Sequence, residues 1–345
     1  MEYRQRWSRW LRFFRRSLTA LIVLSGIIAV ALAVNTCGIF ACTGFAVYDN
    51  EPIYGMNFDY PPRELRFSLT STQGRQVFRM EFPQEGSWYS TVGMNSDGVF
   101  SSAQMLYPVL PAVQAGPDDL YIWAAADYAL EQSSSASAVL SLVNSRRLVE
   151  GETSLHILVA DSSGTAFVLE PGVSGNRITL IQDRFLVMTN FPLADFAGQD
   201  YLQTRGAGAD RYQKAWPFIQ TNLGQFGAAQ AMETLNLARN SGGSPTLVSM
   251  VFLPKQGEVL ISLAGDQSKL WKASLKERII STEKGFEGNG SLALDEKGVL
   301  ATSLRSIPTS VESGWLPLLP WLLAGLVVGI IIGFSLWRWS RHRRT

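Results

Sequence analysis

The segment that begins at Cys42 carries the residues best suited to chemistry. Residues 42–47 (CTGFAV) are followed, after a short turn, by residues 55–61 (GMNFDYP). The chain has only two histidines, His156 and His342, so a Cys/His or Ser/His/Asp site would have to use His156, and a three-histidine zinc site is excluded. An α-amine, with a pKa of about 7.7–8.0, can act as a base near neutral pH without any histidine. Nucleophilic chemistry at Cys42 therefore does not require one.

Charge and hydropathy patterning indicate a membrane protein. Thirty Lys and Arg against 29 Asp and Glu give a net charge of +1, which implies no nucleic-acid partner. Apolar runs at 18–34 and 316–337 each approach the roughly 20 residues that span a bilayer. Arginines flank them on their outer sides, at positions 4, 6, 9, 12, 15 and 16 and at 338, 341, 343 and 344. The positive-inside rule then places both termini in the cytoplasm and the middle of the chain outside the plasma membrane.

The first apolar run has two readings, a cleaved secretory signal or a retained anchor. Residues 39–42 (IFAC) also faintly resemble a lipoprotein box, which would acylate Cys42. Two cysteines, Cys37 and Cys42, cannot form a disulfide framework, and Cys42 could be only a small buried apolar residue. In the second run Gly325, Gly329 and Gly333 share one helix face, a pattern that favours self-association in lipid.

Between the two runs the pattern predicts an α+β domain, with strands, then helices, then strands. Expected strands are 43–48, 52–57, 65–70, 76–82, 89–92, 155–160, 165–170, 177–181, 185–188, 247–253 and 258–262, the last two forming a final hairpin. Expected helices are 118–132, 135–145, 209–216 and 227–239, with Pro217 interrupting the third. Residues 282–313 are polar and rich in Gly and Ser, which favours a linker.

The motifs resemble those of the choloylglycine hydrolase family, which includes bile salt hydrolases and penicillin V acylases. These are N-terminal-nucleophile (Ntn) hydrolases, in which a cysteine becomes the first residue. Residues 57–61 look closest to the related acid ceramidase and N-acylethanolamine amidase group. Four further stretches, 93–98, 158–164, 187–190 and 210–212, agree in order and spacing. The resemblance implies a four-layer αββα sandwich.

With the resemblance, the chain divides into seven segments. They are a basic cytoplasmic segment (1–17), a signal or anchor helix (18–34), a propeptide (35–41), the hydrolase domain (42–281), a linker (282–313), a transmembrane helix (316–337) and a basic cytoplasmic tail (338–345). The mature chain would then begin at Cys42.

The resemblance also implies roles for individual residues. Cys42 would attack an amide carbonyl and form a thioester, with its own α-amine as base. Asp59 would orient that amine, and Asn190 would donate an amide hydrogen to the oxyanion. Arg211 would lie behind the thiol and lower its pKa. The substrate would be an N-acylated small molecule cleaved at a linear C–N amide bond, without metal or cofactor.

Two departures from the family pattern concern substrate binding. Met56 stands where the family usually has arginine, so a charge beside the thiol is missing unless Arg63 or Arg66 supplies it. The family's second oxyanion asparagine has no clear match, and Gln104 occupies that neighbourhood. These gaps keep two alternatives open: a non-catalytic membrane-bound binding or sensor module on the same fold, and a lipoprotein-like scaffold.

Overall fold

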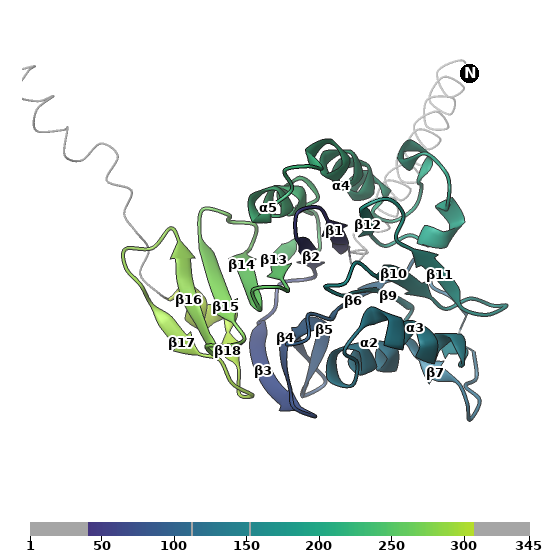
Figure 1. The fold of residues 1–345 in the computed structure, drawn as a ribbon, viewed down its shortest axis with the longest axis horizontal. Coiled ribbons are helices and arrows are strands. Elements are labelled where there is room, and N and C mark those ends of the chain that lie inside the picture. The colour runs from purple at the N-terminus through teal and green to yellow at the C-terminus, as the bar shows by residue number, and fades with distance from the viewer. Residues whose placement is uncertain (1–40, 112, 152, 307–345) are drawn as a thin grey trace, which may run out of the picture.

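The computed structural model describes residues 41–306, except 112 and 152. Over these residues the chain forms two large antiparallel sheets (Figure 1). The first has the strand order β12-β1-β2-β13-β14-β15-β16-β17. Its strands, in chain order, are β1 (Thr43–Tyr48), β2 (Pro52–Asp59), β12 (Phe185–Met188), β13 (Thr246–Leu253), β14 (Glu258–Leu263), β15 (Leu270–Ser274), β16 (Ile279–Lys284) and β17 (Ser291–Ala293).

The second sheet has the order β11-β10-β9-β6-β5-β4-β3-β18. Its strands, in chain order, are β3 (Arg66–Thr72), β4 (Arg75–Gln84), β5 (Ser87–Asn95), β6 (Phe100–Met105), β9 (Leu155–Ala160), β10 (Ala166–Glu170), β11 (Arg177–Leu180) and β18 (Val299–Leu300). A separate short parallel pair joins β7 (Leu120–Tyr121) to β8 (Leu148–Val149).

Helices cover the outer faces of both sheets. Helices α4 (Ala209–Asn222) and α5 (Ala228–Leu237) pack on the first sheet, against β12, β1, β2 and β13. Helices α2 (Ile122–Glu131) and α3 (Ala136–Asn144) lie on the opposite side, with α2 against β5, β6 and β9 (Figure 1). Two 3₁₀ turns, η1 (Leu193–Phe196) and η2 (Tyr201–Gln203), and a short helix α6 (Ala301–Arg305) complete the elements. The layers are therefore helix, sheet, sheet, helix, as the resemblance implied.

The hairpin β1–β2 sets the geometry of the candidate site. Thr43 pairs with Asn57, Gly44 with Met56 and Phe45 with Gly55. A Cβ at Gly55 would collide with the ring of Phe45, so glycine allows that ring to lie across the neighbouring strand. Since the pairing is antiparallel, Cys42 and Asp59 lie at the same end of the hairpin.

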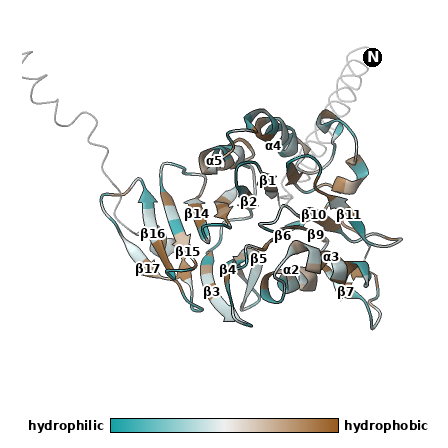
Figure 2. Ribbon diagram, viewed as in Figure 1, coloured by the Kyte–Doolittle hydropathy of each residue, from teal (hydrophilic) through white to brown (hydrophobic). Residues whose placement is uncertain are grey.

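Two hydrophobic cores hold the layers together. The larger fills the space between the sheets and continues beneath α4 and α5, and the smaller lies between the second sheet and α2 and α3. Fully buried aromatic rings such as those of Tyr54, Phe100 and Phe252 pack in the space between the two sheets. The ring centroids of Phe100 and Phe252 are 4.9 Å apart. Figure 2 shows much of the hydrophobic colour on the central strands and the hydrophilic colour at peripheral turns. Burying each large apolar side chain contributes roughly 1.5–3 kcal/mol.

Several expected element bounds were wrong. Helix α4 runs through Pro217, which was expected to interrupt it, because Ala215 and Ile219 on either side of the proline are buried and keep the helix packed. That packing offsets a penalty of about 3 kcal/mol for an internal proline. The 258–262 strand is also not the last, since β15 and β16 extend the first sheet beyond it.

Residues 282–306 were expected to begin a linker and instead complete the domain. Strand β17 pairs with β16 in the first sheet, and β18 pairs with β3 in the second. Leu294 and Leu304 are buried, so this polar stretch is anchored by a few apolar side chains.

No helix in the described part of the chain is long and apolar enough to cross a membrane. The predicted spans at 18–34 and 316–337, and the glycines at 325, 329 and 333, lie outside the described residues.

Candidate active site

Cys42 lies immediately before β1, with 4% of its surface exposed. Its backbone is held on both sides: the N–H donates to Oδ1 of Asn190 at 2.8 Å, and the carbonyl accepts a hydrogen bond from Arg211. Cys42 is the free cysteine of the described residues. The structure therefore fixes the nucleophile candidate by groups that are more than 140 residues away in the sequence.

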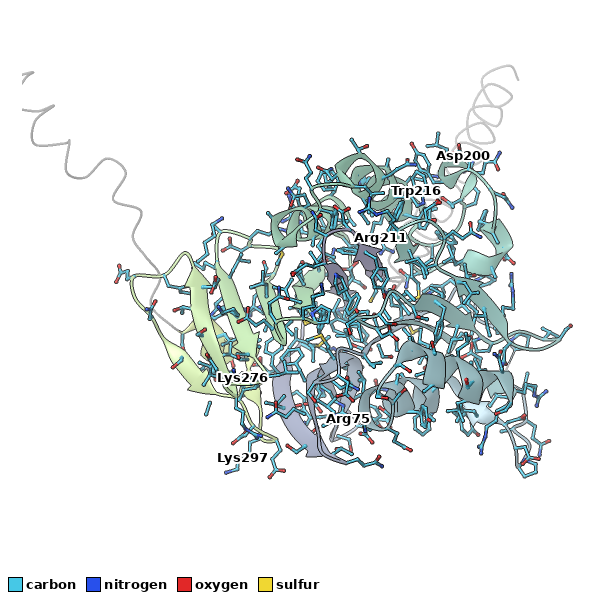
Figure 3. The ribbon with its side chains drawn as sticks, viewed as in Figure 1. Arg75, Asp200, Arg211, Trp216, Lys276 and Lys297 are labelled. Atoms are coloured by element: carbon cyan, nitrogen blue, oxygen red, sulfur yellow. The ribbon has the colours of Figure 1, made fainter. Side chains whose placement is uncertain are left out.

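Arg211 connects the groups around Cys42. Its guanidinium donates to the Thr43 hydroxyl at 2.8 Å and to Oδ1 of Asn190 at 2.7 Å, and it lies 3.7 Å from Oδ2 of Asp59. It enters from the first turn of α4 and lies in the interior, whereas Arg75, Lys276 and Lys297 lie at the periphery (Figure 3). Gly208, the N-cap residue just before the helix, has a φ of +78°, and a Cβ there would collide with the guanidinium. Glycine thus provides both the left-handed turn and the space for Arg211.

Asp59, at the end of β2, is completely buried. Its Oδ1 accepts a hydrogen bond from the Thr246 hydroxyl at 2.6 Å, while its Oδ2 has no hydrogen-bond partner in the described structure. Burial raises the pKa of Asp59 to about 7, against the opposing effects of Arg211 and Thr246. At 3.7 Å the guanidinium is too far to offset the loss of solvation fully. One carboxylate oxygen is therefore left for a further hydrogen-bond donor.

Asn190 follows β12 and is also completely buried. Its Oδ1 accepts from Cys42 and Arg211, and its Nδ2 donates to the Met105 carbonyl at 2.8 Å. Its own carbonyl accepts from the backbone N–H of Tyr107 at 2.8 Å. An amide nitrogen carries two hydrogens, so one remains for another acceptor.

Burial dominates the chemistry of the thiol in this form of the chain. It raises the pKa of Cys42 to about 12, and the carboxylate of Asp59 acts in the same direction. A backbone hydrogen bond from Asp59 and the charge of Arg211 lower that pKa, as expected of Arg211, but they do not overcome burial. Since Ala41 precedes Cys42, the nitrogen of Cys42 is an amide and supplies no charge. The thiol is therefore protonated and weakly nucleophilic here.

The two residues expected at the substrate side are both close to β1. Met56 is fully buried and pairs with Gly44 on one side and with Met250 on the other. Gln104, in β6, reaches across from the second sheet, and its Nε2 would lie 2.6 Å from a Cβ at Gly44. Its Oε1 is buried without a hydrogen-bond partner among the described residues.

The arginines considered as substitutes for the missing charge are engaged elsewhere. Arg66 forms an ion pair with Glu81 at 2.7 Å and stacks on Trp88. Arg63 lies over the ring of Tyr60, with its Cζ 3.8 Å from the ring centroid. The structure therefore brings together Cys42, Asp59, Asn190 and Arg211, with Met56 and Gln104 nearby. Their roles remain predictions.

Some contacts of the site had no signal in the sequence. Thr246 supports Asp59 from β13, and its own Oγ1 accepts from the backbone N–H of Asn240 at 3.0 Å. Asn57, in β2, donates to the Leu235 carbonyl and accepts from the Ser249 hydroxyl, which ties β2 to α5 and β13. Within the described residues, no group of three His, Cys, Asp or Glu side chains could hold a metal ion.

Comparison with known proteins identifies solved structures of similar fold. No protein-family model and no curated protein matches the sequence. Solved structures do match. A mutant of conjugated bile acid hydrolase from Clostridium perfringens has a TM-score of 0.53 at 14% identity, over 70% of this chain and 96% of that chain. A second variant of that hydrolase has a TM-score of 0.56 at 12% identity, over 79% and 99% of the two chains.

Penicillin V acylase from Agrobacterium tumefaciens matches similarly, with a TM-score of 0.55 at 15% identity, over 70% of this chain and 90% of that one. Each alignment covers nearly all of the solved structure, so the likeness extends over a whole domain. The chain has the fold of the Ntn hydrolases, which fits the resemblance to the choloylglycine hydrolase family carried by its motifs.

Proposed function

We propose that this protein is a cysteine amidase that cleaves the linear C–N amide bond of an N-acylated small molecule. The observation that carries the proposal is the convergence of Cys42, Asp59, Asn190 and Arg211 at one end of the β1–β2 hairpin. The fold supports it, since the solved structures that share it are named as a bile acid hydrolase and a penicillin acylase.

Removal of the residues before Cys42 is the step that activates the site in this proposal. Cleavage between Ala41 and Cys42 converts an amide nitrogen into an amine with a pKa of about 7.7–8.0, which can take a proton from the thiol and become an ammonium. A positive charge there lowers the pKa of the Cys42 thiol, which burial holds at about 12 in the uncleaved chain. The partnerless Oδ2 of Asp59 is available to accept a hydrogen bond from that ammonium. The uncleaved chain is therefore expected to have no amidase activity.

The reaction then proceeds in two steps. Sγ of Cys42 attacks the amide carbonyl carbon while the α-amine takes the thiol proton, and the remaining amide hydrogen of Asn190 stabilises the oxyanion. As the C–N bond breaks, the α-ammonium returns that proton to the leaving amine and a thioester remains. Water attacks the thioester carbonyl, which releases the carboxylic acid and restores the thiol.

Met56 is one of the two departures from the family pattern, and we expect it to favour apolar acyl groups. Replacing it with arginine (Met56→Arg) places a cation in a fully buried position beside β1. The pKa of Cys42 should then fall, and the substrate range should shift toward acids and polar acyl groups. The rate of thiol alkylation against pH measures the first effect, and hydrolysis of short polar and long alkyl N-acyl substrates measures the second.

Met56→Leu is the matched control, because it keeps an apolar side chain of similar size, and its alkylation profile should match that of the wild type. A wild-type preference for anionic acyl groups would contradict the assignment of Met56 to an apolar pocket.

The spans at 18–34 and 316–337, if they form, tether the enzyme to the plasma membrane with its catalytic domain on the extracytoplasmic side. Such a tether suits an amphipathic acyl substrate that lies near the bilayer. Signal cleavage would leave the second span as the sole anchor.

In that second span the small-residue face of Gly325, Gly329 and Gly333 is proposed to pair with the same helix of another copy. Gly329→Leu should block close approach of two helices and remove the dimer band from cross-linking in membranes, while amidase activity remains. An unchanged band would remove the reason to assign these glycines a role, as would a dimer formed by residues 42–306 alone.

A second candidate function is a non-catalytic binding or sensor module. Met56 favours it, because methionine supplies no charge or hydrogen bond beside the thiol. Mature protein that begins at Cys42, assayed with a conjugated bile acid, penicillin V and N-acylethanolamines of increasing chain length, separates the two. Release of amine that thiol alkylation abolishes supports the amidase, and tight binding with no turnover of any of these amides supports the module.

A further inference from the structure

His156, in β9, is fully buried, and both of its ring nitrogens have partners. Its Nε2 lies 2.6 Å from the Thr189 carbonyl oxygen, and its Nδ1 lies 3.2 Å from Oε1 of Glu170. Glu170, in β10, is also buried, with 1% of its surface exposed. Neither residue belongs to the proposed catalytic set, yet Thr189 directly precedes Asn190.

The hydrogen-bond pattern determines where the protons lie. A carbonyl oxygen can only accept, so Nε2 of His156 must carry a hydrogen. Glu170 already accepts from two backbone donors, with Oε1 2.6 Å from the nitrogen of Leu193 and Oε2 3.0 Å from that of Ala194. If neither His156 Nδ1 nor Glu170 Oε1 carried a proton, two hydrogen-bond acceptors would face and repel each other. One further proton therefore lies between Nδ1 and Oε1.

These contacts fix both ends of the short segment that contains Asn190. His156 holds Thr189 at its start, and Glu170 holds Leu193 and Ala194 at its end. Between them Asn190 makes its contacts with Cys42, Arg211 and Met105. A shift of this segment would move the Asn190 amide relative to the thiol.

Stability alone is a poor explanation for such a pair. Replacing a buried ion pair by well-packed apolar residues is often neutral or stabilising, because desolvation opposes the attraction. The pair gives what apolar side chains cannot: three directional hydrogen bonds to the backbone on either side of Asn190.

We propose that His156 and Glu170 form a proton-bound clamp that positions Asn190 for oxyanion stabilisation; the catalytic half of this proposal rests on the proposed function. His156 and Glu170 are positioning residues, since neither contacts the reacting atoms. Displacing an oriented group by about 1 Å can cost on the order of 10²-fold in rate. The clamp therefore acts on kcat rather than on substrate binding.

Nitrogen NMR of the full-length protein labelled with ¹⁵N-histidine tests the clamp without any substrate. The chain has only two histidines, so His342→Gln leaves the signals of His156 alone. We expect both ring nitrogens to be protonated or hydrogen-bonded, and Glu170→Gln to shift the Nδ1 signal strongly while Nε2 keeps its hydrogen. A free lone pair on Nδ1, unchanged by Glu170→Gln, would overturn the clamp.

Kinetics test its catalytic consequence. His156→Leu removes both hydrogen bonds of the ring. Its kcat, calculated per active site as titrated by alkylation of Cys42, should fall by about 10²-fold with little change in KM. His156→Gln keeps a donor and should recover part of that loss. Glu150→Gln is the matched control: Glu150 is buried, and its hydrogen bond comes from the nitrogen of Leu155 at the start of β9 rather than from any of residues 189–194.

A kcat for His156→Leu equal to that of the wild type would overturn the positioning role, and so would an equal loss in Glu150→Gln. If the wild-type protein cleaves no amide at all, the proposed function fails, and the NMR result alone then upholds or overturns the clamp.

Discussion

Replacing Cys42 with serine is expected to lower amide turnover by about 10³-fold or more, which is within the range that follows loss of a nucleophile. A hydroxyl ionises far less readily than a thiol, and the groups around Cys42 are arranged about a sulfur whose pKa they can adjust. The backbone contacts of residue 42 with Asn190 and Arg211 do not involve the side chain, so Cys42→Ser should fold normally. Initial rates of amine release by the two purified proteins, at matched folded concentration, give the ratio.

Cys37→Ser is the control, because Cys37 precedes the proposed cleavage site and is absent from the mature chain. Its turnover should equal that of the wild type, and an alkylating reagent should label a single site. Equal loss from both substitutions would show that Cys42 is not the nucleophile.

Arg211→Met is expected to abolish turnover and also to lower the free energy of unfolding by roughly 3–5 kcal/mol, as for other broken buried ion pairs. The substitution removes the donors to Asn190, to Thr43 and to the Cys42 carbonyl, and it takes the neighbouring guanidinium away from the buried Asp59 carboxyl. The pKa of Asp59, already raised by burial to about 7, should rise further. Denaturant unfolding measures the stability change, and the amidase assay measures the catalytic one.

Arg205→Met is the matched control, since Arg205 is exposed and its hydrogen bonds in the described part of the chain go to carbonyls of its own loop. Both quantities should therefore stay close to wild type. Arg211→Lys keeps the charge but loses the planar fork and should fall between wild type and Arg211→Met. If Arg211→Met unfolds with the same free energy as the wild type, the stabilising role assigned to this guanidinium is wrong.

Many strands and helices followed from the sequence because they carry strong local patterns, whereas the four-layer arrangement came from the resemblance. The strand at 43–48 and the helix around 136–144, with Ser135 as its N-cap, appear nearly as expected. The prediction of a linker at residues 282–306 was wrong because β17 and β18 are edge strands of only three and two residues within a polar stretch. Their place is set by partners elsewhere in the chain, which a local pattern does not record.

The four proposed catalytic residues came from the resemblance, and no periodicity or spacing would have selected them. Their supporting contacts were missed for a physical reason: Thr246 meets Asp59 across 187 residues of sequence, and Met105 meets Asn190 across 85. His156 was weighed only as a possible base. Its contact with Thr189, beside Asn190, depends on how β9 of the second sheet lies against β12 of the first, which the sequence alone does not reveal.

Cleavage before Cys42 and acylation of its thiol are tested most directly by the mass of the N-terminal peptide of protein purified from membranes. The mass is measured before and after the protein is briefly exposed to an amide that it hydrolyses and is then quenched with acid. We predict a peptide that begins at Cys42 with a free α-amine and that gains the acyl group on this cysteine after exposure to substrate. Full activity in a chain that still carries residues 34–41, or a Cys42 whose amine is acylated in the active protein, would contradict this prediction.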